Sequence, residues 1–323
     1  MPSITGIGTC WPRQRTIEEL REELGLSEIE VRRFRRGAGF DRVCFDPARS
    51  EADLLLEAIE AVPGIDDLRH RVAWVVRARS LRFGAPWPDR LLAEVCERAG
   101  LGTARAFTVS DQACAAGMFA VDLAVQLLVE DGDPDALAIV LTGEKTYGPG
   151  SRVLPGMALL GEATAAAVVS LGSGPYELLG FANRQVPVGG VSLALDEEST
   201  PLFSQMYYSE VGSVIAQALL EADADSSSVQ RYLPHNVGRS VGVRTGTSIG
   251  LRREQVDHGT LADTGHCWSA DTFMSLLVAQ REGRLAPGDL LLLTAVGFGA
   301  TFAALVCRYA GENVPASATL GSQ

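Results

Sequence analysis

The chain has 323 residues, 46% hydrophobic and 21% charged, a globular composition that is long enough for two packed halves. Its formal net charge of -12 argues against nucleic acid as a partner, because binding to phosphates requires a basic surface. The six cysteines form no Cys-x-x-Cys pair, so we expect neither a metal site nor a disulfide scaffold.

Neither end of the chain carries a convincing targeting or membrane segment. The N-terminus has no basic segment followed by an apolar run, so no signal peptide is predicted. Residues 290–307 contain no charged residue and approach the length of a membrane span. Glycines interrupt this stretch, however, and both flanks have the pattern of strands. We therefore predict two buried strands joined by a glycine turn, in a cytoplasmic protein that does not enter membranes.

The first half of the chain alternates between strand and helix patterns. Thr16 and Ser27 each stand where a helix begins, and Glu19 completes a capping box with Thr16. We predict strands at 4–10, 72–76, 106–109, 136–142 and 163–171, with helices at 16–24, 27–36, 51–62 and 90–99.

The second half repeats this rhythm after a stretch without periodicity at 184–203. Strands are predicted at 177–182, 230–233, 290–295 and 301–308, and helices at 209–221 and 271–281. Alternating strands and helices indicate βαβ units, and therefore a largely parallel sheet that is buried on both faces. The strand at 106–109 is expected to be one of its buried strands. Two such halves in tandem suggest an internal duplication, with one half at 1–172 and the other at 173–323.

Cys114 lies in a segment of small residues, 110–117, between a predicted strand and an apolar helical run. This position places its sulfur at or near a helix N-terminus, whose partial positive charge favours the thiolate. A cysteine of this kind can also be an inert buried residue. We favour a nucleophile, because other stretches supply the groups that such a cysteine needs.

Two histidines and a glycine turn are those other groups. His235 follows a predicted strand, at the edge where open α/β sheets place ligand sites. His266 lies in a loop that leads into a helix, whereas His70 and His258 have no comparable setting and are expected at the surface. The turn at 295–300 can present backbone N–H groups to a developing oxyanion.

Together these stretches resemble the thiolase-fold condensing enzymes, most closely the ketoacyl-ACP synthase III group. Residues 110–117 look like the family's nucleophile segment, and residues 233–236 like its Pro-His segment. Residues 260–266 look like its Gly-Asn segment and 282–293 like its end segment, which puts Gly299 in the oxyanion position. The resemblance implies an α/β, thiolase-like αβαβα five-layer fold of two duplicated halves, a homodimer, and an active site below a pantetheine tunnel.

The sequence departs from this family at two places. His266 stands where the family usually has Asn, which makes a Cys-His-His set similar to that of elongating ketoacyl synthases. Relatives with substitutions here include enzymes that transfer acyl groups to alcohols or amines. The Trp and Arg that grip the adenine of CoA are also missing, with residues 28–30 and Pro155 in their places. This second departure favours acyl carrier protein over acyl-CoA as the donor.

The resemblance implies a thioester-dependent acyltransferase in polyketide, fatty acid or other secondary metabolism. Cys114 takes an acyl group from a phosphopantetheine thioester, with no other cofactor, and its N–H and that of Gly299 stabilise the oxyanion. His235 and His266 are then expected to serve mainly the second half-reaction, a decarboxylative Claisen condensation with a malonyl-type thioester. One alternative is transfer to a hydroxyl or amine with His235 as base. Another is a non-catalytic partner subunit, against which the intact Cys114 and His235 argue.

Five further residues are predicted to contact substrates. Asn236 and Phe298 flank the predicted site, and Trp87 is expected to shape the acyl pocket across the dimer interface, unless it is an exposed loop aromatic. Arg33 and Arg36 belong to a basic patch that either docks an acidic carrier protein or is a solvated helix face. The sequence leaves the acyl group, the acceptor and the pathway open.

Overall fold

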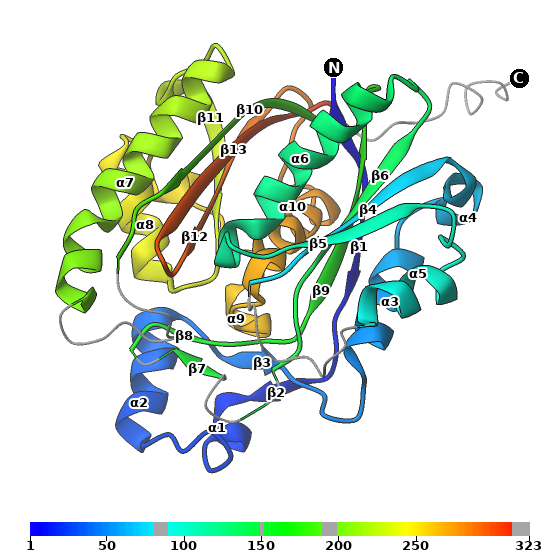
Figure 1. Ribbon diagram of the computed structural model, residues 1–323. Helices are drawn as coiled ribbons and strands as arrows, with labels where there is room; N and C mark the ends of the chain where they lie inside the picture. The colour runs from blue at the N-terminus through cyan, green and yellow to red at the C-terminus, as the bar shows by residue number, and fades with distance from the viewer. Residues whose placement is uncertain (81–89, 147, 149–151, 155, 189–198, 312–323) are drawn as a thin grey trace, which may run out of the picture.

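The computed structural model describes the chain except for residues 81–89, 147, 149–151, 155, 189–198 and 312–323 (Figure 1). Within the described residues, nine strands form one sheet in the order β11-β12-β13-β10-β1-β9-β6-β4-β5. Their bounds are β1 Ser3–Cys10, β4 Val72–Ala78, β5 Arg105–Val109, β6 Leu137–Thr142, β9 Thr164–Ser170, β10 Tyr176–Gln185, β11 Val229–Pro234, β12 Leu290–Gly297 and β13 Thr301–Tyr309.

The sheet is mixed, so the prediction of a largely parallel sheet is wrong. Only β11–β12, β4–β5 and β4–β6 pair in parallel, and the other neighbours are antiparallel. The reason lies in the connections. A parallel pair needs a crossover, usually a helix. In contrast, β12 and β13 are joined by a short glycine turn, and the described residues between β6 and β9 form no helix.

The helices divide the molecule into five layers, as the resemblance implies (Figure 1). The middle layer lies between the two halves of the sheet, one outer layer covers the first half, and the other covers the second half. The sheet halves join where Ser3 and Ile4 of β1 pair with β10. The layers consist of α6 Ala116–Asp131 and α10 Asp271–Arg281 in the middle, α3 Glu51–Glu60 and α5 Leu91–Arg98 outside the first half, and α7 Ser199–Glu221 and α8 Arg239–Ser248 outside the second.

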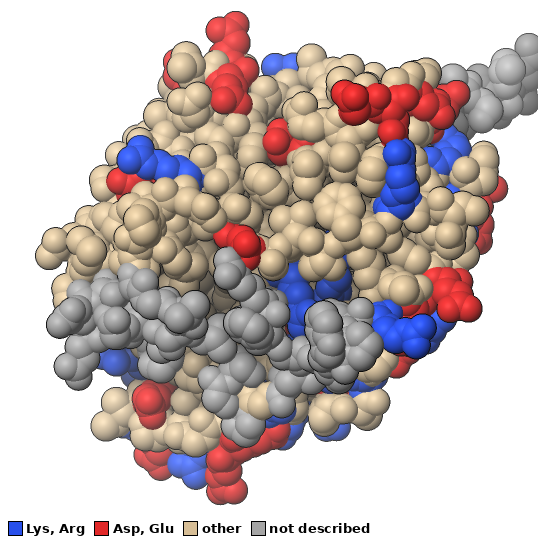
Figure 2. Space-filling view, viewed as in Figure 1, with Lys and Arg blue, Asp and Glu red and all other residues tan. Residues whose placement is uncertain are grey.

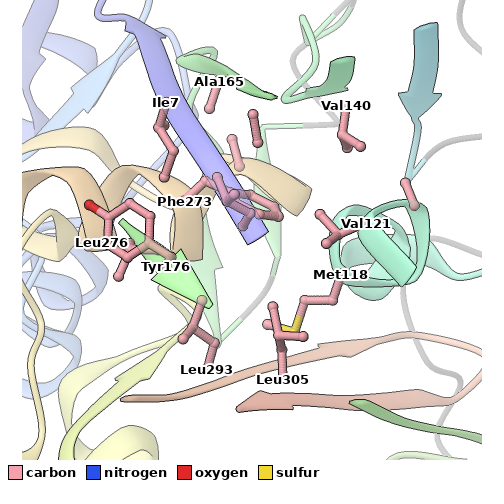
Figure 3. Close-up of a cluster of buried hydrophobic side chains, with 14 of the residues drawn as sticks. Ile7, Met118, Val121, Val140, Ala165, Tyr176, Phe273, Leu276, Leu293 and Leu305 are labelled. Carbon is pink, nitrogen blue, oxygen red and sulfur yellow. The ribbon is translucent and has the colours of Figure 1, made fainter. Parts of the chain in front are cut away.

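The largest apolar core surrounds the middle layer and takes residues from both halves (Figure 3). Met118 of α6, Phe273 of α10 and Leu293 of β12 are all essentially buried there. Burying each such side chain contributes roughly 1.5–3 kcal/mol. Among the described residues, one stretch, Ala113–Asp131, is apolar and long enough for a membrane span. Here it is the central helix, in contact with strands of both halves, and a core helix passes the same test.

A smaller subdomain packs over one end of the middle layer around its own apolar cluster. The predicted capping box at Thr16 is present, and Ser27, predicted as a helix cap, forms a capping box as well. The second helix continues into a π-helix at Arg33–Ala38, which ends at Gly39 with φ 93°. The short elements here are β2 Gln14–Thr16, α1 Ile17–Leu20, α2 Glu28–Arg32, β3 Arg42–Cys44, β7 Val153–Leu154 and β8 Ala158–Leu159; elsewhere α4 spans Ile65–Leu68 and α9 spans Leu261–Thr264.

Candidate active site

Cys114 lies in a 3-10 turn, Ala113–Ala115, that leads directly into α6, as the sequence predicts. It is partly exposed, whereas the other five cysteines are buried. The preceding Ala113 has φ 45°, a left-handed conformation that strains a residue with a Cβ and is characteristic of functional sites. The 16-residue helix α6 directs the partial positive charge of its N-terminus towards this turn.

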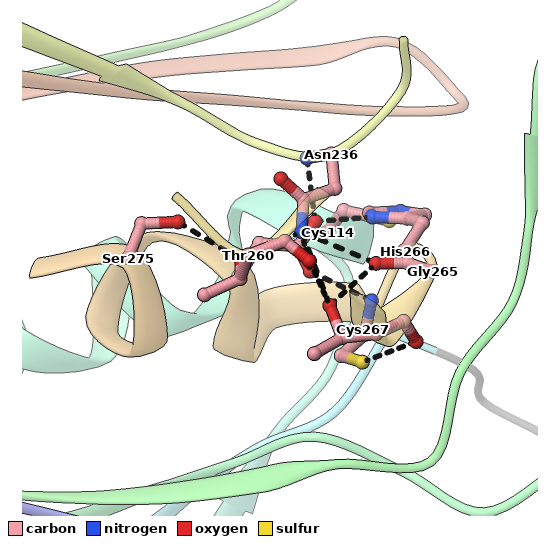
Figure 4. Close-up of polar contacts among 9 residues, drawn as sticks. Cys114, Asn236, Thr260, Gly265, His266, Cys267 and Ser275 are labelled. Atoms are coloured by element: carbon pink, nitrogen blue, oxygen red, sulfur yellow. Dashed lines mark hydrogen bonds and ion pairs between the residues drawn. The ribbon is translucent and has the colours of Figure 1, made fainter. Parts of the chain in front are cut away.

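His266 is in direct contact with this cysteine. Its Nε2 lies 3.2 Å from the Cys114 Sγ (Figure 4). The backbone on either side is held against residues 159–161, because the His266 N–H donates to Leu159 O at 2.8 Å and the His266 carbonyl accepts from Gly161 N at 2.9 Å. The imidazole is therefore fixed beside the Cys114 sulfur.

Asp271, the first residue of α10, lies behind His266. Its Oδ2 is 2.5 Å from the His266 Nδ1 and accepts the backbone N–H of Asn236 at 2.7 Å. Its Oδ1 accepts the backbone N–H of Cys267 at 2.7 Å. One buried carboxylate thus ties together the loops that carry both histidines. The sequence analysis missed this role, because an acidic residue in the first turn of a helix is common and gives little signal of its own.

The pKa values of the two histidines are shifted in opposite directions. Burial lowers the pKa of His266, but the Asp271 carboxylate and the Cys114 sulfur outweigh it and raise this pKa from 6.5 to about 10. Burial and the neighbouring charge of His266 lower the pKa of His235 well below 6.5. The rings are edge to face, with centroids 5.5 Å apart. Both ring nitrogens of His235 are buried and lack a hydrogen-bond partner among the described residues.

The glycine turn between β12 and β13 packs against the turn at Ala113–Ala115 that carries Cys114. A Cβ on Gly297 would lie 2.4 Å from the Ala113 Cβ and 3.0 Å from the Cys114 N, so only glycine fits. Gly299 has φ 135°, and its carbonyl accepts from Val188 N at 2.8 Å. The predicted oxyanion turn is therefore adjacent to Cys114.

Phe298 and Asn236 are two further residues that the sequence predicts to contact substrates. Phe298 is partly buried, in the same cluster as Cys114, and its ring is 5.7 Å from that of Phe203 in α7. The Asn236 amide is buried and donates to Thr260 Oγ1 at 2.9 Å and to Gly265 O at 3.1 Å, so it holds the loops together.

The basic residues lie on the subdomain surface. Arg33 and Arg36 are exposed, and neither forms a salt bridge with another described residue, whereas Arg35 pairs with Glu18 and Asp41. Figure 2 shows acidic and basic side chains intermixed over the region of α1 and α2. The predictions for Trp87 and Pro155 fall outside the described residues.

One expectation about a histidine is wrong. His70 is exposed as predicted, but His258 is partly buried against α8 at Gly242. Burial and the nearby Arg239 lower the pKa of His258 to about 4. Among the residues that the structure describes, no group of three or more His, Cys, Asp or Glu side chains is arranged to hold a metal ion.

Comparison with known proteins shows relatives in sequence and in fold. The family model described as 3-oxoacyl-[acyl-carrier-protein (ACP)] synthase III C terminal matches residues 219–309, which include both site histidines. The β-ketoacyl-[acyl-carrier-protein] synthase III of Rhizorhabdus wittichii is 34% identical over 29% of this chain and 31% of its own length. That of Rhodobacter capsulatus is 25% identical over 66% of this chain and 70% of its own length.

Solved structures share the fold over nearly the full length. ChlB3, titled an acyltransferase, superposes with a TM-score of 0.83 at 20% identity, covering 95% of this chain and 97% of its own. The 3-oxoacyl-[acyl-carrier-protein] synthase III of Aquifex aeolicus gives 0.78 at 18% identity, over 96% of this chain and 100% of its own. In its motifs, fold and relatives, the chain is similar to the ketoacyl-ACP synthase III enzymes.

Proposed function

We propose that this protein is a thioester-dependent acyltransferase that carries its acyl group on Cys114. The observation that supports this most strongly is the contact of 3.2 Å between the Cys114 sulfur and the His266 imidazole, at the N-terminus of α6. A cationic imidazole and a helix N-terminus both favour the nucleophilic thiolate. The partly exposed position of Cys114 leaves this sulfur accessible to a substrate.

In the first half-reaction, the Cys114 thiolate attacks the carbonyl carbon of an acyl thioester. The tetrahedral oxyanion is stabilised by the N–H groups of Cys114 and Gly299. When the intermediate collapses, the bond to the donor sulfur breaks and the leaving thiolate takes the Nε2 proton of His266. The products are acyl-Cys114, a free phosphopantetheine thiol and a neutral His266.

Two acceptors suit the second half-reaction. The sequence favours a malonyl-type thioester, which loses CO₂ and forms a carbon–carbon bond, and the names of the relatives as β-ketoacyl synthases support this. Transfer to a protic acceptor, with a thiol, hydroxyl or amine, is the alternative. The donor is an acyl carrier protein or acyl-CoA, and a homodimer is the expected assembly.

Intact-mass spectrometry of the protein with acyl-carrier and acyl-CoA donors tests the proposal. We expect a mass increase of one acyl group for a competent donor, and no increase for Cys114→Ala. A control, Cys96→Ala, removes a buried cysteine of the outer helix α5 and should keep the adduct. An adduct that persists in Cys114→Ala would show that Cys114 is not the acyl carrier.

A further inference from the structure

The hydrogen bonds around Asp271 determine where the proton of His266 resides. A backbone N–H can only donate, and such groups from Asn236 and Cys267 occupy both carboxylate oxygens. Both oxygens of Asp271 therefore act as acceptors. The His266 Nδ1, 2.5 Å from Oδ2, accordingly carries a hydrogen and donates it.

The position of this hydrogen on Nδ1 of His266 matters after acylation. Once His266 has given its Nε2 proton to the leaving thiol, the remaining proton is on Nδ1 and is bound to Asp271. The Nε2 that faces Cys114 is then bare and accepts hydrogen bonds. Acylation also changes the Cys114 sulfur, which together with Asp271 raises the pKa of His266.

We propose that Asp271 makes His266 an acid–base catalyst, so that the second half-reaction transfers the acyl group directly to a protic acceptor, a thiol, hydroxyl or amine, without decarboxylation. This inference rests on the proposed acyl-Cys114. A bare Nε2 is suited to take a proton from such an acceptor. It is unsuited to donate the hydrogen bond that the enolate oxygen of a decarboxylating malonyl thioester needs.

The proposed step balances and closes the cycle. The acceptor X–H gives its proton to His266 Nε2 while X bonds to the acyl carbon. The bond between that carbon and the Cys114 sulfur breaks, and the thiolate and the imidazolium are restored. His235, buried and without a partner for either ring nitrogen among the described residues, is placed beside His266 to hydrogen-bond the acceptor. His266 thus takes the role of base that the sequence analysis gave to His235.

The experiment uses protein acylated on Cys114 and freed of donor. One arm adds malonyl-pantetheine labelled in its carboxylate and measures CO₂ release; the other adds pantetheine or ethanolamine and measures loss of acyl-Cys114. We expect discharge to pantetheine or ethanolamine and CO₂ release below one-tenth of the acyl-enzyme. Stoichiometric CO₂ release with a β-ketoacyl product would overturn the inference and leave the acyl-enzyme intact. Failure to form acyl-Cys114 would overturn the proposed function and the inference with it.

Two variants and one NMR measurement distinguish a role of Asp271 in positioning His266 from a role in protein stability. Asp271→Asn removes the charge and should slow discharge to the protic acceptor by at least 100-fold. Asp131→Asn, at the far end of α6 where Asp131 pairs with Arg105, should leave the discharge unchanged. Nitrogen-15 NMR of the histidine rings in the acyl-enzyme reads the tautomer directly. We expect a hydrogen on Nδ1 of His266 and a bare Nε2; the reverse tautomer, or unchanged discharge in Asp271→Asn, would contradict the proposal.

Discussion

His266 and Asp271 form a buried pair whose charge should be visible in the pH dependence of stability. The folded protein keeps His266 protonated up to a pKa of about 10, whereas the unfolded chain releases that proton near 6.5. The folded state therefore binds more protons between these values. The stability that this group contributes is complete below about pH 6.5 and is lost as the pH rises towards 10, by at most about 1.4 kcal/mol per pH unit for one proton.

Chemical denaturation at several pH values checks this sign. The difference in the free energy of unfolding between the wild type and His266→Gln should shrink as the pH rises from 6.5 to 10. His235 acts in the opposite direction, because its depressed pKa makes folding less favourable as the pH falls below 6.5. A difference between wild type and His266→Gln that grows with pH would contradict the ion pair with Asp271.

The sequence locates the residues proposed to react better than the residues that support them. Cys114, His235 and His266 each lie beside a recognisable strand or helix boundary, which is a local signal. The role of Asp271 depends on contacts with Asn236 and Cys267 in two separate loops, and no local pattern records such contacts. An acidic residue in the first turn of a helix is also common as a helix-stabilising residue, so Asp271 gives little sequence signal of its own.

At the scale of elements, the close contact between the β12–β13 turn and the nucleophile turn should be intolerant of even a methyl group. Gly297→Ala places a Cβ 2.4 Å from the Ala113 Cβ and 2.8 Å from the Gln112 carbonyl. Both neighbours are backbone or Cβ atoms, which cannot rotate away. We expect stability to fall by roughly 1–3 kcal/mol through overpacking and acylation to slow by at least tenfold.

Gly212→Ala is the matched control for this substitution. Gly212 lies within α7, where an added Cβ meets nothing within 4 Å, so the same change should raise stability by up to about 1 kcal/mol and leave acylation unchanged. Thermal unfolding and the rate of acylation are the two measurements. If Gly297→Ala acylates as fast as Gly212→Ala, the two turns are not coupled as described.

The sequence locates most strands and helices, but not how deeply they are buried or where they begin and end. The run at 106–109 reads as a buried strand, yet β5 is the edge of the sheet and is partly exposed. Helix α7 begins at Ser199, ten residues before the predicted start, because aromatic packing rather than periodicity stabilises its first turns. Helix α8 was not predicted, since its Gly and Thr residues are poor helix formers and tertiary packing overrides that preference.

At the scale of the whole molecule, a net charge of -12 should oppose the approach of an acidic carrier protein. Arg33 and Arg36, exposed on the subdomain above the site and without salt bridges to described residues, are suited to offset this repulsion. We predict that acyl-carrier donors outperform acyl-CoA and that their advantage shrinks with added salt, because the screening length is about 10 Å at 0.1 M.

Charge reversal tests this prediction, and a second pair of substitutions that changes the net charge by the same amount is the control. Arg33→Glu with Arg36→Glu should remove much of the advantage of carrier donors, measured as the second-order rate of acylation. Arg253→Glu with Arg281→Glu changes the net charge equally at exposed positions outside the subdomain and should have a smaller effect. Equal effects of the two pairs would mean that only net charge matters.

The measurement that tests the account most directly is the rate at which Cys114 is acylated, followed by quenched-flow mass spectrometry with the adduct mapped to its peptide. The account predicts one acyl group per chain on Cys114. For His266 it departs from the expectation that both histidines serve mainly the second half-reaction. His266→Ala should slow acylation by about 10²–10⁴-fold, the usual range for loss of a proton-transfer group, whereas His235→Ala should change it by less than about fivefold. An adduct on any other residue, or equal rates in the two histidine variants, would contradict it.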